Sequence, residues 1–107
     1  MTHISLPENI EEIFPGCFSF SGLEEVVIPR NVNRIVGADD YYGAFQCCKN
    51  LRSVVFEQGS KLTEIGDNAF SECKSLQNIC LPDKLREIGV FAFESTGLTE
   101  VWIPANV

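Results

Sequence analysis

The chain has 107 residues, a length that suits one domain with a modest core. Its net charge is −7 and its basic residues are scattered singly, which argues against a nucleic-acid partner because phosphates attract Lys- and Arg-rich surfaces. No apolar run approaches the roughly 18 residues of a membrane span. The first residues have neither the basic nor the apolar segment of a signal peptide.

One apolar pattern recurs along the chain and predicts its strands. The spacing Leu-x-x-Val-x-Ile starts at Leu23 and returns, with small changes, at Leu51, Leu76 and Leu98. Its second half alternates, as expected of a strand with one buried face. We expect strands near residues 2–6, 23–28, 51–56, 76–81 and 98–103. A chain built from one recurring unit predicts a repeat architecture, with residues 1–107 forming a single domain.

A second pattern fills the return of each unit. An isoleucine recurs, and after it a small residue stands beside a phenylalanine, at Ile13, Ile35, Ile65 and Ile88 and at Cys17-Phe18, Ala44-Phe45, Ala69-Phe70 and Ala92-Phe93. The small residue lets neighbouring units approach, while the rings fill the interior. We expect each unit to be a strand, a turn and an irregular or short helical return.

One segment, near residues 36–43, interrupts the repeat. Phe45 follows Ile35 by ten positions, whereas Phe70 follows Ile65 by five. The inserted residues include Asp39, Asp40, Tyr41 and Tyr42. Tyrosines on a loop of a rigid scaffold favour recognition, but a long loop costs little entropy, so a tolerated bulge is an equal alternative. Two adjacent carboxylates lack the alternating ligands of a calcium loop.

The motif Leu-x-x-Ile-x-Leu-Pro, followed by Ile-Gly-x-x-Ala-Phe-x-x-Cys-x-x-Leu, resembles the BspA-like branch of the leucine-rich repeat family. Its second part stands most fully at residues 65–76, and Phe14 and Val36 depart from it by replacing the glycine. The resemblance implies an α/β fold class: a right-handed solenoid with a parallel sheet on its concave face. Similar proteins occur on bacterial surfaces and in mucosal protists, so the resemblance implies attachment or protein binding, and a cell-surface location.

The outward strand positions are the candidate binding residues. Parallel stacking places equivalent residues about 4.8 Å apart, so they form columns across the sheet. An apolar column flanked by polar ones is typical of an interface, although β-branched residues also simply suit strands. Trp102 favours binding, because aromatic residues anchor interfaces. The candidates for the concave face are Glu24, Glu25, Val27, Arg52, Val55, Asn78, Cys80, Glu100 and Trp102. Glu24 and Arg52 are expected to pair and to affect partner choice more than stability.

Five cysteines, an odd number, exclude a fully paired disulfide framework and favour reduced thiols. This count and the missing signal peptide favour the cytoplasm for the chain as written, against the surface location that the resemblance implies, and the compartment stays open. Cys48, Cys73 and Cys17 occupy core slots, whereas Cys47 and Cys80 are expected to be exposed. With no Cys-x-x-Cys pair and His3 as the single histidine, we expect no metal.

The sequence predicts a binding protein and not an enzyme. It has no nucleophile elbow and no glycine-rich phosphate loop, so we expect no catalytic residue and no cofactor. A protein or peptide ligand on the strand face is the leading hypothesis. The alternative is a structural or self-associating slice of a longer array, including a homodimer through exposed terminal units, because repeat stacks need polar caps and none is visible.

Overall fold

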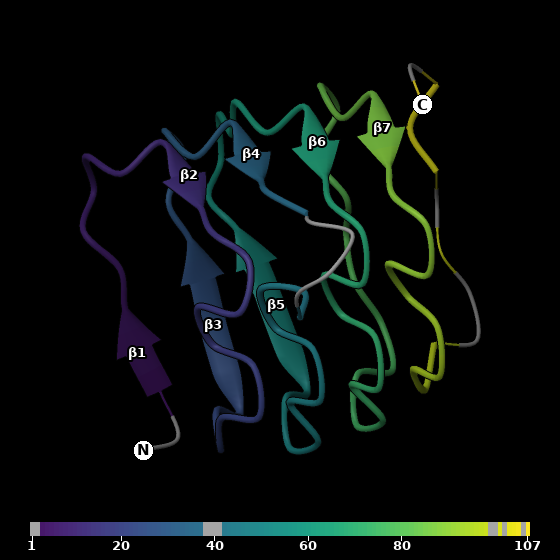
Figure 1. Cartoon of the computed structure of the whole chain (residues 1–107). Coiled ribbons are helices and arrows are strands. Elements are labelled where there is room, and N and C mark those ends of the chain that lie inside the picture. Colours follow the sequence, from purple (N-terminus) through teal and green to yellow (C-terminus); the bar gives the residue numbers. More distant parts are fainter. Residues whose placement is uncertain (1–2, 38–41, 99–100, 102, 106) are drawn as a thin grey trace.

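The computed structural model describes residues 3–37, 42–98, 101, 103–105 and 107. The described residues form seven short strands and no helix, and the strands fall into two parallel sheets that run as two rows along the molecule (Figure 1). The first sheet has the order β1-β3-β5 and the second the order β2-β4-β6-β7. The strand bounds are β1 His3–Ser5, β2 Glu12–Ile13, β3 Glu25–Ile28, β4 Arg34–Ile35, β5 Ser53–Phe56, β6 Glu64–Ile65 and β7 Glu87–Ile88.

The register of the first sheet confirms the predicted alignment of the units. Val26 pairs with Val54 and Val27 pairs with Val55, so each strand lies beside its counterpart one unit later. Val26, Ile28 and Val54 are buried, as the alternation predicts. The sequence period is therefore also the spatial period of the sheet.

The returns, expected to be irregular or short and helical, contain no helix in the described residues; each has a two-residue strand of the second sheet, followed by turns. The recurring isoleucines pair directly, Ile13 with Ile35, Ile35 with Ile65 and Ile65 with Ile88. Each unit then donates to the unit before it, as when the Gly66 N–H donates to the Ile35 carbonyl over 2.7 Å. Because the neighbouring unit satisfies these backbone groups, the return needs no helix.

Two predicted strands differ in the structure. Residues 76–81 are not a strand, although Leu76 and Ile79 are buried in the same core as their counterparts. Residues 98, 101 and 103 also lie outside any strand, and the rest of the 98–103 prediction includes positions outside the described residues. The predicted strands at 23–28 and 51–56 are present in shortened form as β3 and β5.

A stack of phenylalanine rings forms the centre of the core. The rings of Phe18, Phe45, Phe70 and Phe93 follow one another with centroid distances of 5.2, 5.2 and 5.6 Å, and they are nearly parallel. The backbone supports the stack, since the Phe45 N–H donates to the Ala69 carbonyl and the Phe70 N–H to the Ala92 carbonyl, both over 2.8 Å. The predicted small-plus-large packing is confirmed.

Glycine after the isoleucine has a steric cause. A Cβ on Gly66 would lie 2.6 Å from the Gly37 Cα and 2.7 Å from the Ile35 carbonyl oxygen. Real Cβ contacts are not that short, so only glycine allows two units to approach this closely at the turn.

Candidate functional site

The predicted apolar column lies on β3, on β5 and on residues 76–81, which follow β5 without being a strand. We call Val27, Val55 and Cys80 the apolar strip. Val27 and Val55 are paired neighbours, and Val55 is 50% exposed. Cys80 is exposed next to the buried Ile79. Two further candidates, Glu100 and Trp102, lie outside the described residues.

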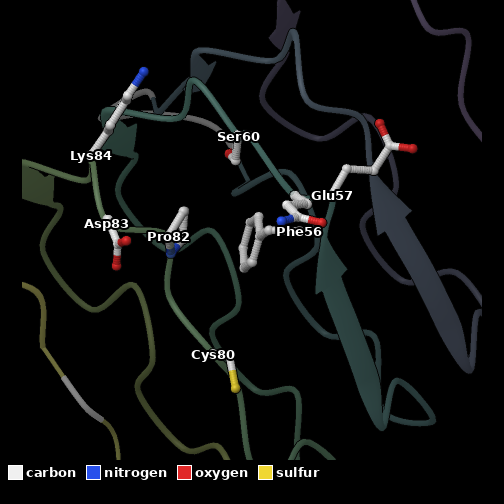
Figure 2. Close-up of a pocket in the computed structure, with 9 residues that line it drawn as sticks. Phe56, Glu57, Ser60, Cys80, Pro82, Asp83 and Lys84 are labelled. Carbon is white, nitrogen blue, oxygen red and sulfur yellow. The ribbon is translucent and has the colours of Figure 1, made fainter.

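The surface is hollowed beside the strip, between β5 and residues 76–81. A cavity of about 260 Å³ opens there, lined by Ser53, Val54, Val55, Phe56, Asn78, Ile79 and Cys80. A second hollow of about 310 Å³ adjoins it and shares Phe56 and Cys80 (Figure 2). Pro82, Asp83 and Lys84 contribute to its wall. Together the two hollows form what we call the β5 groove, which brings the predicted residues Val55, Asn78 and Cys80 together.

The charged rim of the strip contains the predicted ion pair. Arg52 Nη1 lies 2.5 Å from Glu24 Oε1, and Arg52 Nη2 lies 3.8 Å from Glu25 Oε1. The hydrogen bond and the charge of Glu24 raise the pKa of Arg52 above its ordinary value, so this guanidinium stays protonated. Four of the candidate residues, Glu24, Glu25, Val27 and Arg52, therefore lie around β3 and the start of β5.

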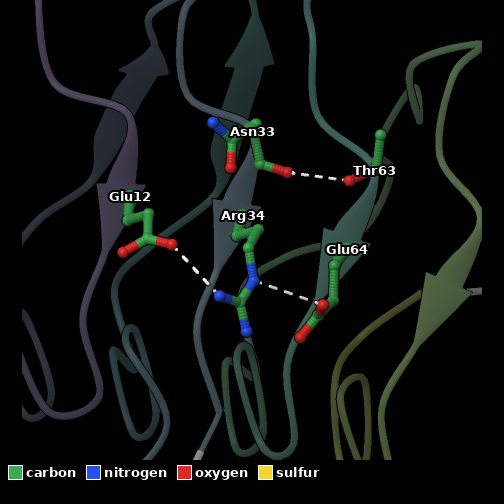
Figure 3. A network of polar contacts seen from close by, with 5 residues as sticks. All are labelled: Glu12, Asn33, Arg34, Thr63 and Glu64. Atoms are coloured by element: carbon green, nitrogen blue, oxygen red, sulfur yellow. Dashed lines mark hydrogen bonds and ion pairs between the residues drawn. The ribbon is translucent and has the colours of Figure 1, made fainter.

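A second charged row, on the other sheet, escaped the sequence analysis. Arg34 on β4 lies between two carboxylates, 3.1 Å from Glu12 on β2 and 3.3 Å from Glu64 on β6 (Figure 3). Hydrogen bonding to Glu64 is the main reason that the pKa of Arg34 is raised. The signal was present, because each of these residues directly precedes the recurring isoleucine.

The cysteines divide by burial. Cys48 and Cys73 are fully buried, and their thiols donate to the carbonyls of Phe18 over 3.0 Å and Phe45 over 3.1 Å. Hydrogen bonding between the two sulfurs is the main cause that lowers the pKa of Cys48 and raises the pKa of Cys73, so the two thiols titrate as a pair.

Cys17 corrects one sequence prediction, because it is exposed, whereas Ala44, Ala69 and Ala92 in the same slot are buried. It lies in the same unit as β2, at the edge of the second sheet. Cys80 is exposed as expected, and Cys47 is half-buried. Among the residues that the structure describes, no three His, Cys, Asp or Glu side chains are grouped to hold a metal ion.

Of the insertion candidates, Asp39, Asp40 and Tyr41 lie outside the described residues. Tyr42 is exposed and packs edge-on against Phe20, with ring centroids 5.0 Å apart. Sequence analysis missed Phe20. This residue occupies the position in its unit that Cys47 occupies in the next unit, and both have a positive φ. One ring of this exposed aromatic pair thus comes from the insertion and the other from the preceding unit.

Comparison with protein families matches residues 1–107 to the family described as BspA type Leucine rich repeat region, in six copies. This is a non-enzymatic repeat family, which suggests a protein-interaction module. Comparisons with curated proteins and with solved structures gave no match. In the described part of the chain, no helix has the length and apolarity needed to cross a membrane. The chain belongs to the BspA-type leucine-rich repeat family.

Proposed function

We propose that this protein binds another protein or a peptide on the face formed by β1, β3, β5 and residues 76–81. The observation that carries the proposal is the apolar strip, exposed at Val55 and Cys80, beside the β5 groove and bordered by Glu24, Glu25 and Arg52. An apolar centre with a charged rim is the usual anatomy of a protein interface. Membership of a repeat family that suggests protein interaction supports the same function.

The proposal includes the arrangement of the units and the extent of the surface. We expect residues 1–107 to form one right-handed solenoid with this face on its concave side, and Glu100 and Trp102 to extend the surface. Attachment to a cell or host surface is the form of binding that the family resemblance implies.

A displayed random-peptide library selected against the whole chain tests the proposal. Val55→Lys removes apolar surface from the strip and is expected to weaken a selected binder about tenfold, the equivalent of about 1.4 kcal/mol. Val90→Lys is the matched control, because Val90 is 62% exposed but is not part of the strip. Equal binding by both variants would place the binding surface elsewhere and contradict the proposal.

A second candidate function is self-association of a structural module. Phe14 is 59% exposed and Phe91 is 57% exposed, and they belong to the units of β2 and β7, the two edge strands of the second sheet. Exposed aromatic residues at both edges favour contact between copies.

A further inference from the structure

The turn that follows β5 is longer than the turn of the next unit. Phe56, the last residue of β5, precedes the buried Leu62 by six positions, whereas Leu81 precedes its counterpart Leu85 by four. Gly59, with a φ of 82°, provides the left-handed residue of the longer turn. A longer turn beside a shorter one leaves a step between two units. The hollow of about 310 Å³ lies at this step and is lined by both turns, so we call it the turn hollow.

Ser60 takes the place of a backbone acceptor in the longer turn. The Leu85 N–H donates to the Pro82 carbonyl over 3.2 Å, but the Leu62 N–H donates to the Ser60 Oγ, also over 3.2 Å. Ser60 lines the turn hollow although it is only 8% exposed. Its oxygen acts as an acceptor, and none of the described residues accepts its hydroxyl hydrogen. This buried hydrogen is therefore available to a ligand.

Two rings form the walls of the turn hollow. Figure 2 shows Phe56 and Pro82 on opposite sides of it, with Ser60 next to the space between them. Cys80 adds its sulfur to the lining. The space between the rings is therefore apolar except for one hydroxyl group.

The charged residues of the lining favour a neutral ligand. The side chains of Glu57, Asp83 and Lys84 lie outside the space between the two rings (Figure 2). The Glu57 carboxylate already accepts a hydrogen bond from the Arg30 N–H over 2.8 Å. Asp83 and Lys84 are adjacent in the sequence and carry opposite charges, so their fields oppose each other at the hollow.

We infer that the turn hollow takes one tyrosine side chain of the protein or peptide that binds the apolar strip. The inference rests on the proposed function and names a residue of the partner that the site recognises. The tyrosine ring lies between Phe56 and Pro82, where aromatic contact adds to the burial of apolar surface. The Ser60 O–H donates to the phenol oxygen. The rest of the partner lies over the apolar strip and does not enter between β5 and residues 76–81.

Tyrosine is the side chain that meets both requirements of the turn hollow. It combines a flat ring with an oxygen that accepts a hydrogen bond, whereas phenylalanine has no acceptor and the indole of tryptophan is only a donor. Histidine is partly charged near neutral pH, and the hollow suits a neutral group. At about 310 Å³ the hollow is at the small end of ligand pockets, which begin at about 300 Å³, so it holds one side chain.

The probes are N-acetyltyrosinamide and N-acetylphenylalaninamide, each titrated into the isotope-labelled full chain while amide chemical shifts are followed by NMR. Dissociation constants on the order of 1 mM are expected for ligands of this size. The largest shifts should occur at Phe56, Gly59 and Ser60. The tyrosine compound should bind about fivefold more tightly than the phenylalanine compound, because it gains one hydrogen bond.

Two variants test the contacts. Ser60→Ala removes the donor and should make the two compounds bind equally, whereas Phe56→Leu removes one ring wall and should weaken both about threefold. Ser60→Ala also leaves the Leu62 N–H without its acceptor, so the ratio of the two dissociation constants is compared, because a purely structural role would not change it. Ser75→Ala is the matched control and should keep the fivefold ratio, since its hydroxyl donates to the Lys49 carbonyl and is not part of the hollow.

Each other outcome overturns the inference. Equal binding of the two compounds by the wild type would show that the hollow recognises no hydroxyl group. A fivefold ratio that persists in Ser60→Ala would assign the phenol to a different partner. Shifts confined to residues outside the turn hollow, or no shifts at about 10 mM, would show that the hollow takes no ring. The proposed function is tested separately by Val55→Lys and the random library, so it can stand when this inference fails.

Discussion

Phe70 lies between Phe45 and Phe93 in the ring stack, and none of its side chain is exposed. If the ring of Phe70 is removed, its surroundings cannot collapse to fill the space, because the backbone hydrogen bonds between units hold the neighbouring units in place. The contribution of a phenylalanine to the stability of this protein therefore depends on its position in the ring stack more than on its residue type.

Phe70→Ala is expected to lower the free energy of unfolding by about 3–5 kcal/mol, since it deletes a buried ring and leaves a cavity. Phe14→Ala deletes the same atoms from a side chain that is 59% exposed and should change stability by about 0.5 kcal/mol or less. Urea midpoints compared between the two variants provide the measurement. Equal midpoints would contradict the position of Phe70 in the core.

The thiols should react in the order of their exposure. An aromatic disulfide reagent is expected to modify Cys17 and Cys80 in the native protein, because both are exposed, and to reach Cys48 and Cys73 only after unfolding. The pKa of Cys48 is lowered by its hydrogen bond with Cys73, but a buried thiol that the reagent cannot contact does not react. Rapid modification of Cys48 in the folded state, located by mass spectrometry, would show that the core opens locally.

The two-residue strands of the second sheet each carry one charged residue, and the parallel pairing of the strands aligns these residues in a row. Glu12, Arg34 and Glu64 alternate in sign across β2, β4 and β6, whereas Glu87 on β7 lies next to Glu64. Electrostatic attraction therefore favours the register of β2, β4 and β6. Between β6 and β7 it is replaced by repulsion, because two carboxylates are neighbours there.

Arg34→Ala is expected to lower the urea midpoint in dilute buffer, because it leaves two carboxylates without their shared cation. The difference from wild type should largely vanish in about 1 M sodium chloride, where the Debye length is about 3 Å. Arg86→Ala removes a guanidinium for which no ion pair is seen among the described residues, so it serves as the control. A salt-independent loss in Arg34→Ala would indicate a packing role instead.

Deletion of residues 38–42 should leave the fold intact. Gly37 lies against the backbone of Asp67 and Gly43 against that of Asn68, so the two ends of the insertion flank consecutive residues, whose Cα atoms are about 3.8 Å apart. One peptide bond can close that gap, and we expect the free energy of unfolding to change by about 1 kcal/mol or less.

Deletion of residues 43–47, the same length taken from the turn ladder, is the control and should prevent folding. Circular dichroism and a urea titration distinguish the two deletions. If the 38–42 deletion also fails to fold, the insertion is structural, and the recognition hypothesis for Asp39, Asp40, Tyr41 and Tyr42 loses its basis.

As a whole molecule, the protein is a stack of units with β1 and β2 at one end and β7 near the other (Figure 1). The middle units bury their apolar side chains completely, as Ile35 and Ile65 show, whereas Ile88 next to them is only partly buried. Ile13 in the first unit is buried, but Leu6, Ile10 and Phe18 beside it are only partly buried, because each unit covers only its neighbours.

Self-association is therefore expected to use the two ends. The mass measured by light scattering should rise with protein concentration, and the combined variant Phe14→Lys and Phe91→Lys should reduce that rise by replacing exposed rings with charge. Val55→Lys leaves both ends unchanged and should associate like the wild type. A monomeric mass across a wide concentration range would refute self-association.

The sequence by itself determined the periodic features. The apolar spacing specified which side chains face the core, because residues at equivalent positions share a register, and the pairing of Val26 with Val54 and of Ile35 with Ile65 follows it. The ring stack and the Glu24–Arg52 pair were predictable for the same reason.

Only the tertiary structure decided how closely neighbouring units approach. Residues 76–81 carry the strand pattern, yet they make no hydrogen bond to β5, because an apolar pattern specifies which face is buried and not the distance between two backbones. Cys17 occupies the slot of Ala69, but it is exposed, whereas Ala44, Ala69 and Ala92 in that slot are buried, so the repeat pattern alone did not determine its burial. The β5 groove lies between two successive units, β5 in one and residues 76–81 in the next, so the pattern of a single unit could not predict it.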